Sequence, residues 1–294
     1  MESFKRIKQV LILILFLNLL VAFLKMFYGF YINSTSLIAD GYHSFSDSSG
    51  NIIGLIGICF ASKPEDEDHP YGHKKFETFA SIFISVMLFV VSFDILKNAY
   101  ARFLNPIEPR ITIDSLLIMI LTLTINVFVF IYEYKQGIKL KSDILISDSL
   151  HTKSDIFVSV SVLITLLALR FGITPYIDPV MSIFISIFII RAGIKIIKHS
   201  SDILCDRIVV DSKKIHDIAV GIEGVLACHQ IRSRGREDDI NIDLHIMVAP
   251  DNDIKTAHDI STELEEKLKK EIPGVGKVLI HIEPYENNEF HIDK

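Results

Sequence analysis

The chain has 294 residues, of which 50% are hydrophobic and 22% charged, and its formal net charge is −6. This composition is too apolar for an ordinary soluble protein. The three scattered cysteines, Cys59, Cys205 and Cys228, form no C-x-x-C pair, which argues against a disulfide scaffold or a thiolate zinc finger. The glycines form no phosphate-binding loop, so the sequence shows no machinery for ATP-driven pumping.

The apolar residues gather in six runs, each about as long as the 20 residues that a helix needs to cross a bilayer. The runs cover residues 9–31, 36–61, 76–101, 111–134, 142–171 and 175–200. We interpret the first run as a membrane helix and not as a signal peptide, because it is long and lacks a small-residue cleavage site. Most Lys and Arg residues that flank the runs lie on the side of both termini. The sequence therefore predicts a multi-pass protein of the cell inner membrane with cytoplasmic termini.

The second and fifth runs share the pattern Asp-x-x-His-x-x-x-Asp, formed by Asp40, His43 and Asp47 and by Asp148, His151 and Asp155. Residues at this spacing lie on one face of a helix. A charged side chain at the bilayer centre costs about 2.5–3.5 kcal/mol or more, so two such stripes indicate a function. Two imidazoles and two carboxylates suit a tetrahedral Zn²⁺ ion. The alternative is that the stripes only join the two helices by hydrogen bonds.

Two further features accompany these stripes. We expect Asp40 and Asp148 to lie one turn further toward the outside, where they orient the ligands or form part of an exit path. Gly50, Gly54 and Gly57 have the small-residue spacing of closely packed membrane helices.

The loop after the second run combines carboxylates with two histidines four residues apart, His69 and His73, preceded by Asp66. Such a loop either binds a metal ion or is a solvated acidic segment that attracts cations. The spacing by itself favours neither interpretation.

The composition changes after residue 208, which divides the chain into a membrane domain, residues 1–208, and a C-terminal domain, residues 209–294. The latter holds 18 Asp and Glu against 11 Lys and Arg, a net charge of −7. Its pattern predicts a helix at 212–221, strands at 224–233 and 239–249, a helix at 254–272 and a strand at 277–283. The expected fold is therefore an αββαβ sandwich, with Asp253 and Thr256 as cap residues of the long helix.

Four residues of this domain are candidates for a second metal site. His281 and Glu283 share one face of the last predicted strand, His245 lies on the polar face of the middle strand, and His229 lies in the first strand. The alternative is that each is an ordinary surface residue.

These motifs resemble those of the cation diffusion facilitators, the zinc-transporter family of metal/proton antiporters. The segments from Leu37 to Asp47 and from Ser147 to Asp155 are similar to the family's motifs in helices 2 and 5. The resemblance implies a transport site of His43, Asp47, His151 and Asp155. The H-x-x-G-H segment that begins at His69 implies a loop site of Asp66, His69 and His73.

The resemblance extends to the C-terminal domain through the segments from Ala227 to Arg232 and from Ile280 to Pro284. It implies a metallochaperone-like, ferredoxin-like fold and a homodimer joined through this domain. The implied metal ligands are His229, His245, His281 and Glu283, with His258 as a candidate for a second ion. Glu283 departs from the family pattern, in which a shorter Asp is common.

The sequence thus predicts a secondary-active exporter of divalent cations, with Zn²⁺ preferred, that works by proton antiport. It predicts no enzyme, no organic cofactor and no nucleic-acid partner. The alternatives are an exporter of Fe²⁺, Mn²⁺, Co²⁺ or Cd²⁺, and a membrane-tethered metal sensor, which would leave the duplicated motif unused. An intramembrane zinc hydrolase would need a general base such as the Glu of H-E-x-x-H, and no such motif is present.

Overall fold

The computed structural model describes residues 2–31, 35–104, 113–170 and 177–286, which form two compact units. We call residues Met1–Ser200 the membrane unit and residues Ser201–Lys294 the tail unit. Within the helices, the side chains of residues 35–37, 39, 40, 43, 46, 113–115, 165–170, 177 and 178 lie outside the described part of the chain.

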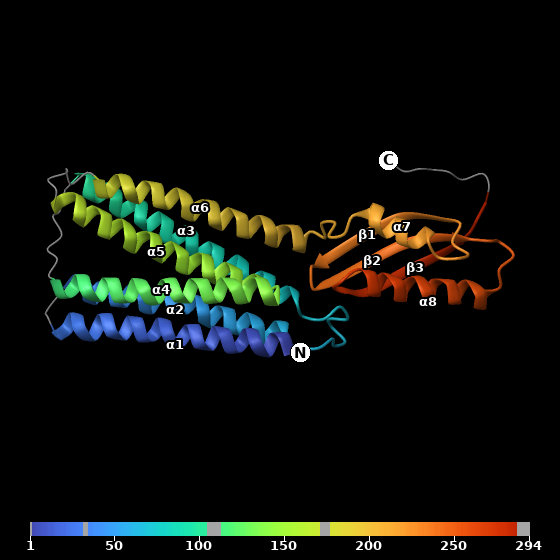
Figure 1. The fold of residues 1–294 in the computed structure, drawn as a ribbon, viewed down its shortest axis with the longest axis horizontal. Coiled ribbons are helices and arrows are strands. Elements are labelled where there is room, and N and C mark those ends of the chain that lie inside the picture. Colours follow the sequence, from blue (N-terminus) through green and yellow to red (C-terminus); the bar gives the residue numbers. More distant parts are fainter. Residues whose placement is uncertain (1, 32–34, 105–112, 171–176, 287–294) are drawn as a thin grey trace. The chain divides into compact units, whose positions relative to one another are not determined.

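The described part of the membrane unit consists of long helices that run side by side (Figure 1). They are α1 (Glu2–Tyr31), α2 (Thr35–Ala61), α3 (Lys75–Leu104), α4 (Ile113–Leu140), α5 (Asp143–Arg170) and α6 (Ile177–Leu204). Helix α2 packs against α1, α3 and α5, and α5 also packs against α3 and α4. The two helices that carry the duplicated motif therefore lie among the other helices of the bundle.

Four of the described helices are long and apolar enough to cross a membrane. They are α1, α3, the segment Leu116–Leu140 of α4 and the segment Pro179–Leu204 of α6. Helix α2 contains a shorter apolar stretch, Asp47–Ala61. Polar side chains interrupt α2 and α5, and such residues are tolerated in a membrane protein where they face other helices instead of lipid.

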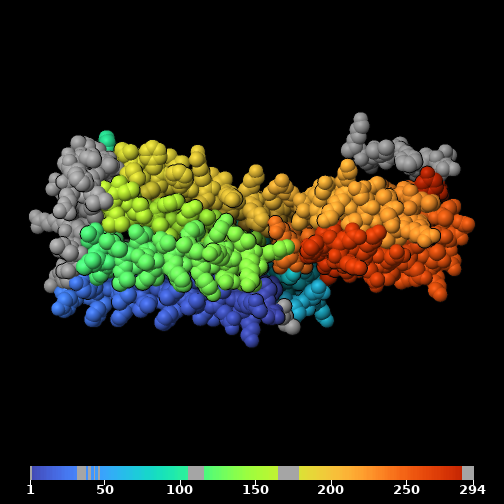
Figure 2. Space-filling view, viewed as in Figure 1, coloured from blue at the N-terminus to red at the C-terminus, as the bar shows by residue number. Residues whose placement is uncertain are grey.

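The outer surface of the membrane unit is rich in large apolar side chains. Helices α1 (blue) and α4 (green) form much of the face seen in Figure 2. Their exposed positions include Phe16, Phe23 and Phe27 on α1 and Leu117 and Phe128 on α4. An apolar surface of this extent is expected of a protein surrounded by lipid tails.

The tail unit has the predicted αββαβ order. Its elements are α7 (Ser212–Val220), β1 (Ala227–Arg236), β2 (Asp239–Val248), α8 (Ile254–Glu271) and β3 (Val275–Pro284). The sheet has the order β1-β2-β3, with β1 antiparallel and β3 parallel to β2. The carboxylate of Asp253 caps α8 by accepting a hydrogen bond from the Thr256 amide at 2.7 Å.

Both predicted boundaries of the first strand of the tail unit are wrong. Strand β1 runs from Ala227 to Arg236, whereas the sequence predicted residues 224–233. Gly224 adopts a φ of +93°, which belongs to a turn and which side chains with a Cβ rarely adopt. Ile222 and Val225 are buried although they lie in this turn, so their apolar character resembled a strand.

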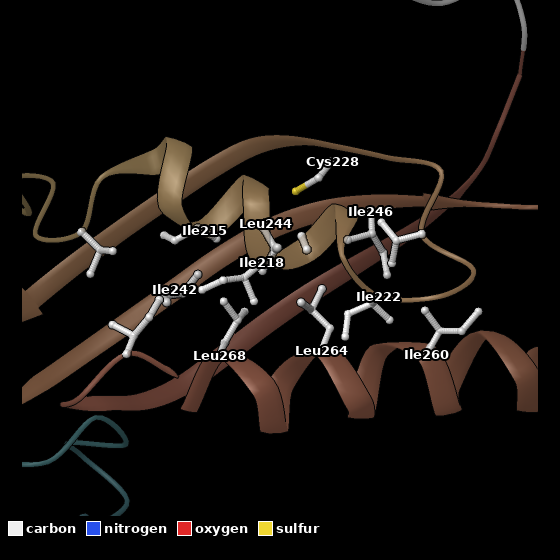
Figure 3. Close-up of a cluster of buried hydrophobic side chains, with 14 of the residues drawn as sticks. Ile215, Ile218, Ile222, Cys228, Ile242, Leu244, Ile246, Ile260, Leu264 and Leu268 are labelled. Carbon is white, nitrogen blue, oxygen red and sulfur yellow. The ribbon is translucent and has the colours of Figure 1, made fainter. Parts of the chain in front are cut away.

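The core of the tail unit lies between the sheet and its two helices (Figure 3). Ile242, Leu244 and Ile246 of β2 are at most 1% exposed and contribute the inner face of the middle strand. Leu264 and Leu268 of α8 are fully buried and pack against that face. The alternate residues of β2 therefore point to the opposite face of the sheet, which the helices do not cover.

This core predicts that Leu264→Ala lowers the free energy of unfolding of the tail unit by about 2–5 kcal/mol, because it leaves a cavity in a packed interior. Ile254→Ala is the matched control, because Ile254 is 89% exposed on the same helix. The thiol of Cys228 reports the unfolding: it is buried, and its burial raises its pKa to about 11. Cys59 and Cys205 are exposed and are first replaced by Ser. The measurement is the urea dependence of Cys228 labelling, and equal midpoints for the two variants would contradict the described core.

Candidate metal centres

Helices α2 and α5 approach each other along a line of glycines. A Cβ added at Gly54 would lie 3.2 Å from Cγ2 of Ile144, and one added at Gly50 would lie 3.4 Å from a carboxylate oxygen of Asp148. At Gly57 it would lie 2.5 Å from Cβ of Ala80 on α3, closer than real Cβ atoms approach. The glycines therefore let α2 contact its neighbours closely, as small residues do in membrane bundles.

Beside this contact the structure brings together three of the four predicted membrane ligands. Asp47 of α2 and His151 and Asp155 of α5 each offer one ligand atom, and these atoms lie within 4.8 Å of one another. Nε2 of His151 is 3.6 Å from Oδ1 of Asp47. The fourth predicted residue, His43, lies on α2 one turn before Asp47, and its side chain is outside the described part.

The membrane group is buried and its imidazole has no hydrogen bond. The side chain of His151 is 5% exposed and that of Asp47 is 15% exposed. Neither ring nitrogen of His151 has a hydrogen-bond partner among the described residues. Buried polar atoms are normally paired, so this ring is positioned to bind something else. A small cavity of about 20 Å³, large enough for roughly one water molecule, adjoins the group.

Asp148 does not lie where the sequence analysis placed it. Helix α5 begins at Asp143, so Asp148 precedes His151 on the side of the loop after α4, whereas Asp40 lies on the far side of Asp47. The two helices run in opposite directions, and Asn51, one turn beyond Asp47, donates a hydrogen bond to Oδ2 of Asp148. Asp40 and Asp148 therefore flank the group on opposite sides and cannot share one exit path.

The sequence analysis missed four polar residues around this group. Nδ2 of Asn18 on α1 donates to Oδ1 of Asn51 at 2.8 Å, and Nζ of Lys25 on α1 donates to Oγ of Ser44 at 2.9 Å. Glu133 on α4 is fully buried. Charged residues inside apolar runs are a recognised functional signal, which could have identified Lys25 and Glu133. Asn18 and Asn51 carry no such signal.

The loop residues Asp66, His69 and His73 also form a group, with ligand atoms within 4.8 Å of one another. The amide of His69 donates to Oδ1 of Asp66 at 2.7 Å, and Nε2 of His73 is 3.3 Å from Oδ2 of Asp66. Gly72, with a φ of +80°, makes a tight turn between His69 and His73, and the centroids of these two rings lie 4.3 Å apart.

The local contacts prepare this loop for a cation. Nδ1 of His73 lies 2.9 Å from the carbonyl oxygen of Pro64, a contact that holds the proton on Nδ1 and leaves the lone pair of Nε2 directed at Asp66. Desolvation opposes ionisation of Asp66, but hydrogen bonds from the backbone and ring of His69 outweigh it and lower the pKa of Asp66. The carboxylate therefore stays ionised, as a metal ligand must.

In the tail unit, the strand register aligns three histidines across the uncovered face of the sheet. His229 pairs with His245 across β1 and β2, and His245 pairs with His281 across β2 and β3. The ring centroids lie 5.3 Å and 4.6 Å apart. Ligand atoms of His229, His245 and Glu283 lie within 4.8 Å of one another. His281 flanks this group, with Nε2 at 3.5 Å from Glu283.

Glu283 is the residue on which the three histidines converge. Nδ1 of His245 is 2.8 Å from Oε1 of Glu283, and Nε2 of His229 is 3.3 Å from Oε2. The hydrogen bond from His245 lowers the pKa of Glu283, against the effect of desolvation and with help from the charge of nearby imidazoles. The longer Glu thus reaches all three rings. His258, the candidate for a second ion, lies exposed on α8 and is not part of this group.

Comparison with known proteins gives two matches to family models. The cation efflux transmembrane domain matches residues 11–205, and the cation efflux protein, cytoplasmic domain, matches residues 210–285. Together they cover the described helices of the membrane unit and the sheet of the tail unit.

Three curated relatives cover most of the chain. An uncharacterized transporter of Methanocaldococcus jannaschii is 32% identical over 95% of this chain and 99% of its own length. The manganese efflux system protein MneS of Bacillus subtilis is 30% identical over 91% of this chain and 92% of its own. A cadmium, cobalt and zinc/H(+)-K(+) antiporter of the same organism is 27% identical over 88% of this chain and 84% of its own. The chain belongs to the cation efflux family, the cation diffusion facilitators, whose members are multi-pass membrane proteins that export divalent metal cations.

Proposed function

We propose that this chain exports Zn²⁺ from the cytoplasm in exchange for protons, with Asp47, His151 and Asp155 as ligands of the transported ion and His43 as the fourth. The observation that carries the proposal is the buried imidazole of His151, which has no hydrogen-bond partner among the described residues and lies beside two carboxylates. A set of two nitrogen and two oxygen donors matches the preference of Zn²⁺.

Charge balance supports a divalent ion at this place. Asp47 and Asp155 together carry two negative charges beside His151 in a bundle where water is scarce, and positive charge close to them stabilises such groups. A single divalent cation neutralises both carboxylates. The same charge balance predicts that the site binds protons when it holds no metal ion.

Protons can compete with the metal ion for the imidazole of His151. An imidazole binds metal only when it is neutral, and it can accept a proton when the ion leaves. His151 therefore offers the same nitrogen to either a metal ion or a proton, and Asp47 at 3.6 Å stabilises the protonated ring. Competition for one nitrogen is the minimal coupling that an antiporter needs.

Mn²⁺ is the second candidate. The relative MneS is named for manganese efflux, whereas the relative that is an antiporter is named for cadmium, cobalt and zinc. Mn²⁺ prefers oxygen donors, and the cavity at the membrane group is also lined by the oxygen-bearing side chains of Asn126 and Asp148. Transport assays with both ions decide between them.

We further propose that the protein is a homodimer of the cell inner membrane with both termini in the cytoplasm. In that orientation two groups face the cytoplasm. One is the loop group of Asp66, His69 and His73, and the other is the group of His229, His245, His281 and Glu283 in the tail unit, which we call the histidine ladder. The ladder side chains are between 28% and 63% exposed, so ions reach them from solution. We assign to the ladder the role of a cytoplasmic zinc sensor that favours the active arrangement of the two tails.

We expect Asp155→Asn to reduce Zn²⁺ uptake into proteoliposomes with an acidic lumen to the level of protein-free vesicles. The substitution keeps the shape of the side chain but removes one of the two charges that balance the ion. Asp94→Asn is the matched control, because Asp94 is an exposed carboxylate on α3 away from the group. Transport by Asp155→Asn at the rate of the control would remove this group from the mechanism.

We expect His43→Asp to change selectivity without abolishing transport. The ratio of Mn²⁺ to Zn²⁺ uptake should rise about tenfold, which corresponds to ~1.4 kcal/mol of differential binding, because an oxygen donor replaces a nitrogen donor. His216→Asp, in the tail unit and outside the three groups, should leave the ratio unchanged. An unchanged ratio in His43→Asp would mean that His43 does not contact the ion.

We expect His245→Ala to raise the Zn²⁺ concentration needed for half-maximal transport while the maximal rate stays close to that of the wild type. The variant removes the central ring of the ladder and leaves the membrane group intact. His216→Ala is the control. Identical transport curves for His245→Ala and the wild type would leave the ladder without a regulatory role.

A further inference from the structure

Glu133 is a buried carboxylate that is not a ligand in the proposed transport site. It lies on α4, is 0% exposed, and both of its carboxylate oxygens are buried without a hydrogen-bond partner among the described residues. An ionised carboxylate left in this state in a membrane bundle is strongly unfavourable. Its oxygens therefore lie where a positive charge would be stabilised, and no described side chain donates a hydrogen bond to them.

Asp148 of α5 is the group that Glu133 faces. The two carboxylates are close enough to interact with each other, and Asp148 is 2% exposed. Two ionised carboxylates only accept hydrogen bonds, so they lie close together when one of them is protonated or when a cation binds both. Two buried carboxylates that face each other thus offer oxygen donors on which a divalent cation can bind.

A chain of amides fixes the orientation of this pair. Asn18 donates to Asn51, and Asn51 donates to Oδ2 of Asp148, which links α1, α2 and α5. The amide of Asn51 satisfies one oxygen of Asp148 but brings no charge.

The pair adjoins the proposed transport site on one side, because Asp148 also lines the cavity beside Asp47 and His151. Glu133 lies two turns before the end of α4 at Leu140, and Asp148 lies near the start of α5 at Asp143, so both are on the side of the loop that joins α4 to α5. In the proposed orientation this is the cytoplasmic side. An ion that enters from the cytoplasm would meet Glu133 and Asp148 before Asp47 and His151.

We propose that Glu133 and Asp148 form a second binding site for a divalent cation, built from oxygen donors, which the ion occupies between the cytoplasm and the transport site. This inference rests on the proposed function of Asp47, His151 and Asp155 as the transport site. The two sites differ in chemistry. Glu133 and Asp148, which we call the entry pair, offer only oxygen ligands, whereas the proposed transport site adds imidazole nitrogen. The entry pair therefore favours Mn²⁺ relative to Zn²⁺ more than the transport site does.

The test is the concentration dependence of Mn²⁺ and of Zn²⁺ uptake by the full-length protein in proteoliposomes. Glu133→Gln keeps the shape of the side chain and removes its charge. We expect it to raise the KM for Mn²⁺ about tenfold or more, with a smaller rise for Zn²⁺, so that selectivity moves toward Zn²⁺. Glu133→Asp keeps the charge and should restore part of the affinity for Mn²⁺. Thr122→Val is the matched control, because Thr122 is a buried polar residue of α4 that bonds only within its own helix.

Three outcomes are decisive and distinct. If Glu133→Gln transports both ions with wild-type KM values while Asp155→Asn is inactive, Glu133 is an uncharged structural residue and the entry site is refuted, although the transport site stands. If Asp155→Asn remains active, the transport site itself is refuted. An equal rise of KM for both ions in Glu133→Gln and in Thr122→Val would reflect general damage to α4 and would also overturn the proposal.

Discussion

The concentration of carboxylates beside a buried imidazole inside the helix bundle is the constraint on which the membrane unit depends. Asp47, Asp148 and Asp155 of α2 and α5 and Glu133 of α4 place four carboxylates in one region, and the histidine beside them has no hydrogen bond in the described part of the chain. Such groups are stable in a bilayer only with cations. In the proposed function, the transported ion or protons supply positive charge to this region.

Close helix packing makes this concentration of charge possible. The glycines of α2 let α5 approach until the carboxylate of Asp148 contacts Gly50, and the same approach brings Asp47 to His151. A larger residue at Gly54 or Gly57 would separate the helices and enlarge the site. The distances between the candidate ligands therefore depend on the packing of α2 against α5. A conformational change that moves α5 relative to α2 would change the affinity of the proposed site for the ion.

The three candidate metal centres are organised at different levels of structure and differ in access to solvent. The group of Asp66, His69 and His73 depends on the turn at Gly72 and on contacts between residues that are at most nine positions apart in the chain. The ladder of the tail unit depends on strand register, and its residues remain partly exposed. The membrane group is nearly enclosed. Exposed sites exchange ions readily with the cytoplasm and suit sensing, whereas an enclosed site with matched charge suits controlled transfer.

The sequence by itself determined the architecture and most of the candidate ligands. Runs of apolar residues predicted the long helices, alternation predicted the αββαβ tail, and helical spacing placed His151 and Asp155 on one face. These are local properties, because periodicity along the chain reports directly which side of a helix or strand is buried. The resemblance to the family then supplied the candidates of the loop and the tail.

Only the tertiary structure decided which residues of different elements meet. Asp148 follows the same local pattern as Asp40, yet the opposite directions of α2 and α5 put it on the other side of the transport site. Asn18, Asn51 and Glu133 gained importance from partners on neighbouring helices, which no spacing within one helix encodes. The alignment of His229, His245 and His281 likewise required the pairing register of three strands. Periodicity fixes a direction around one axis, whereas contact between elements depends on their relative direction and depth, which packing alone sets.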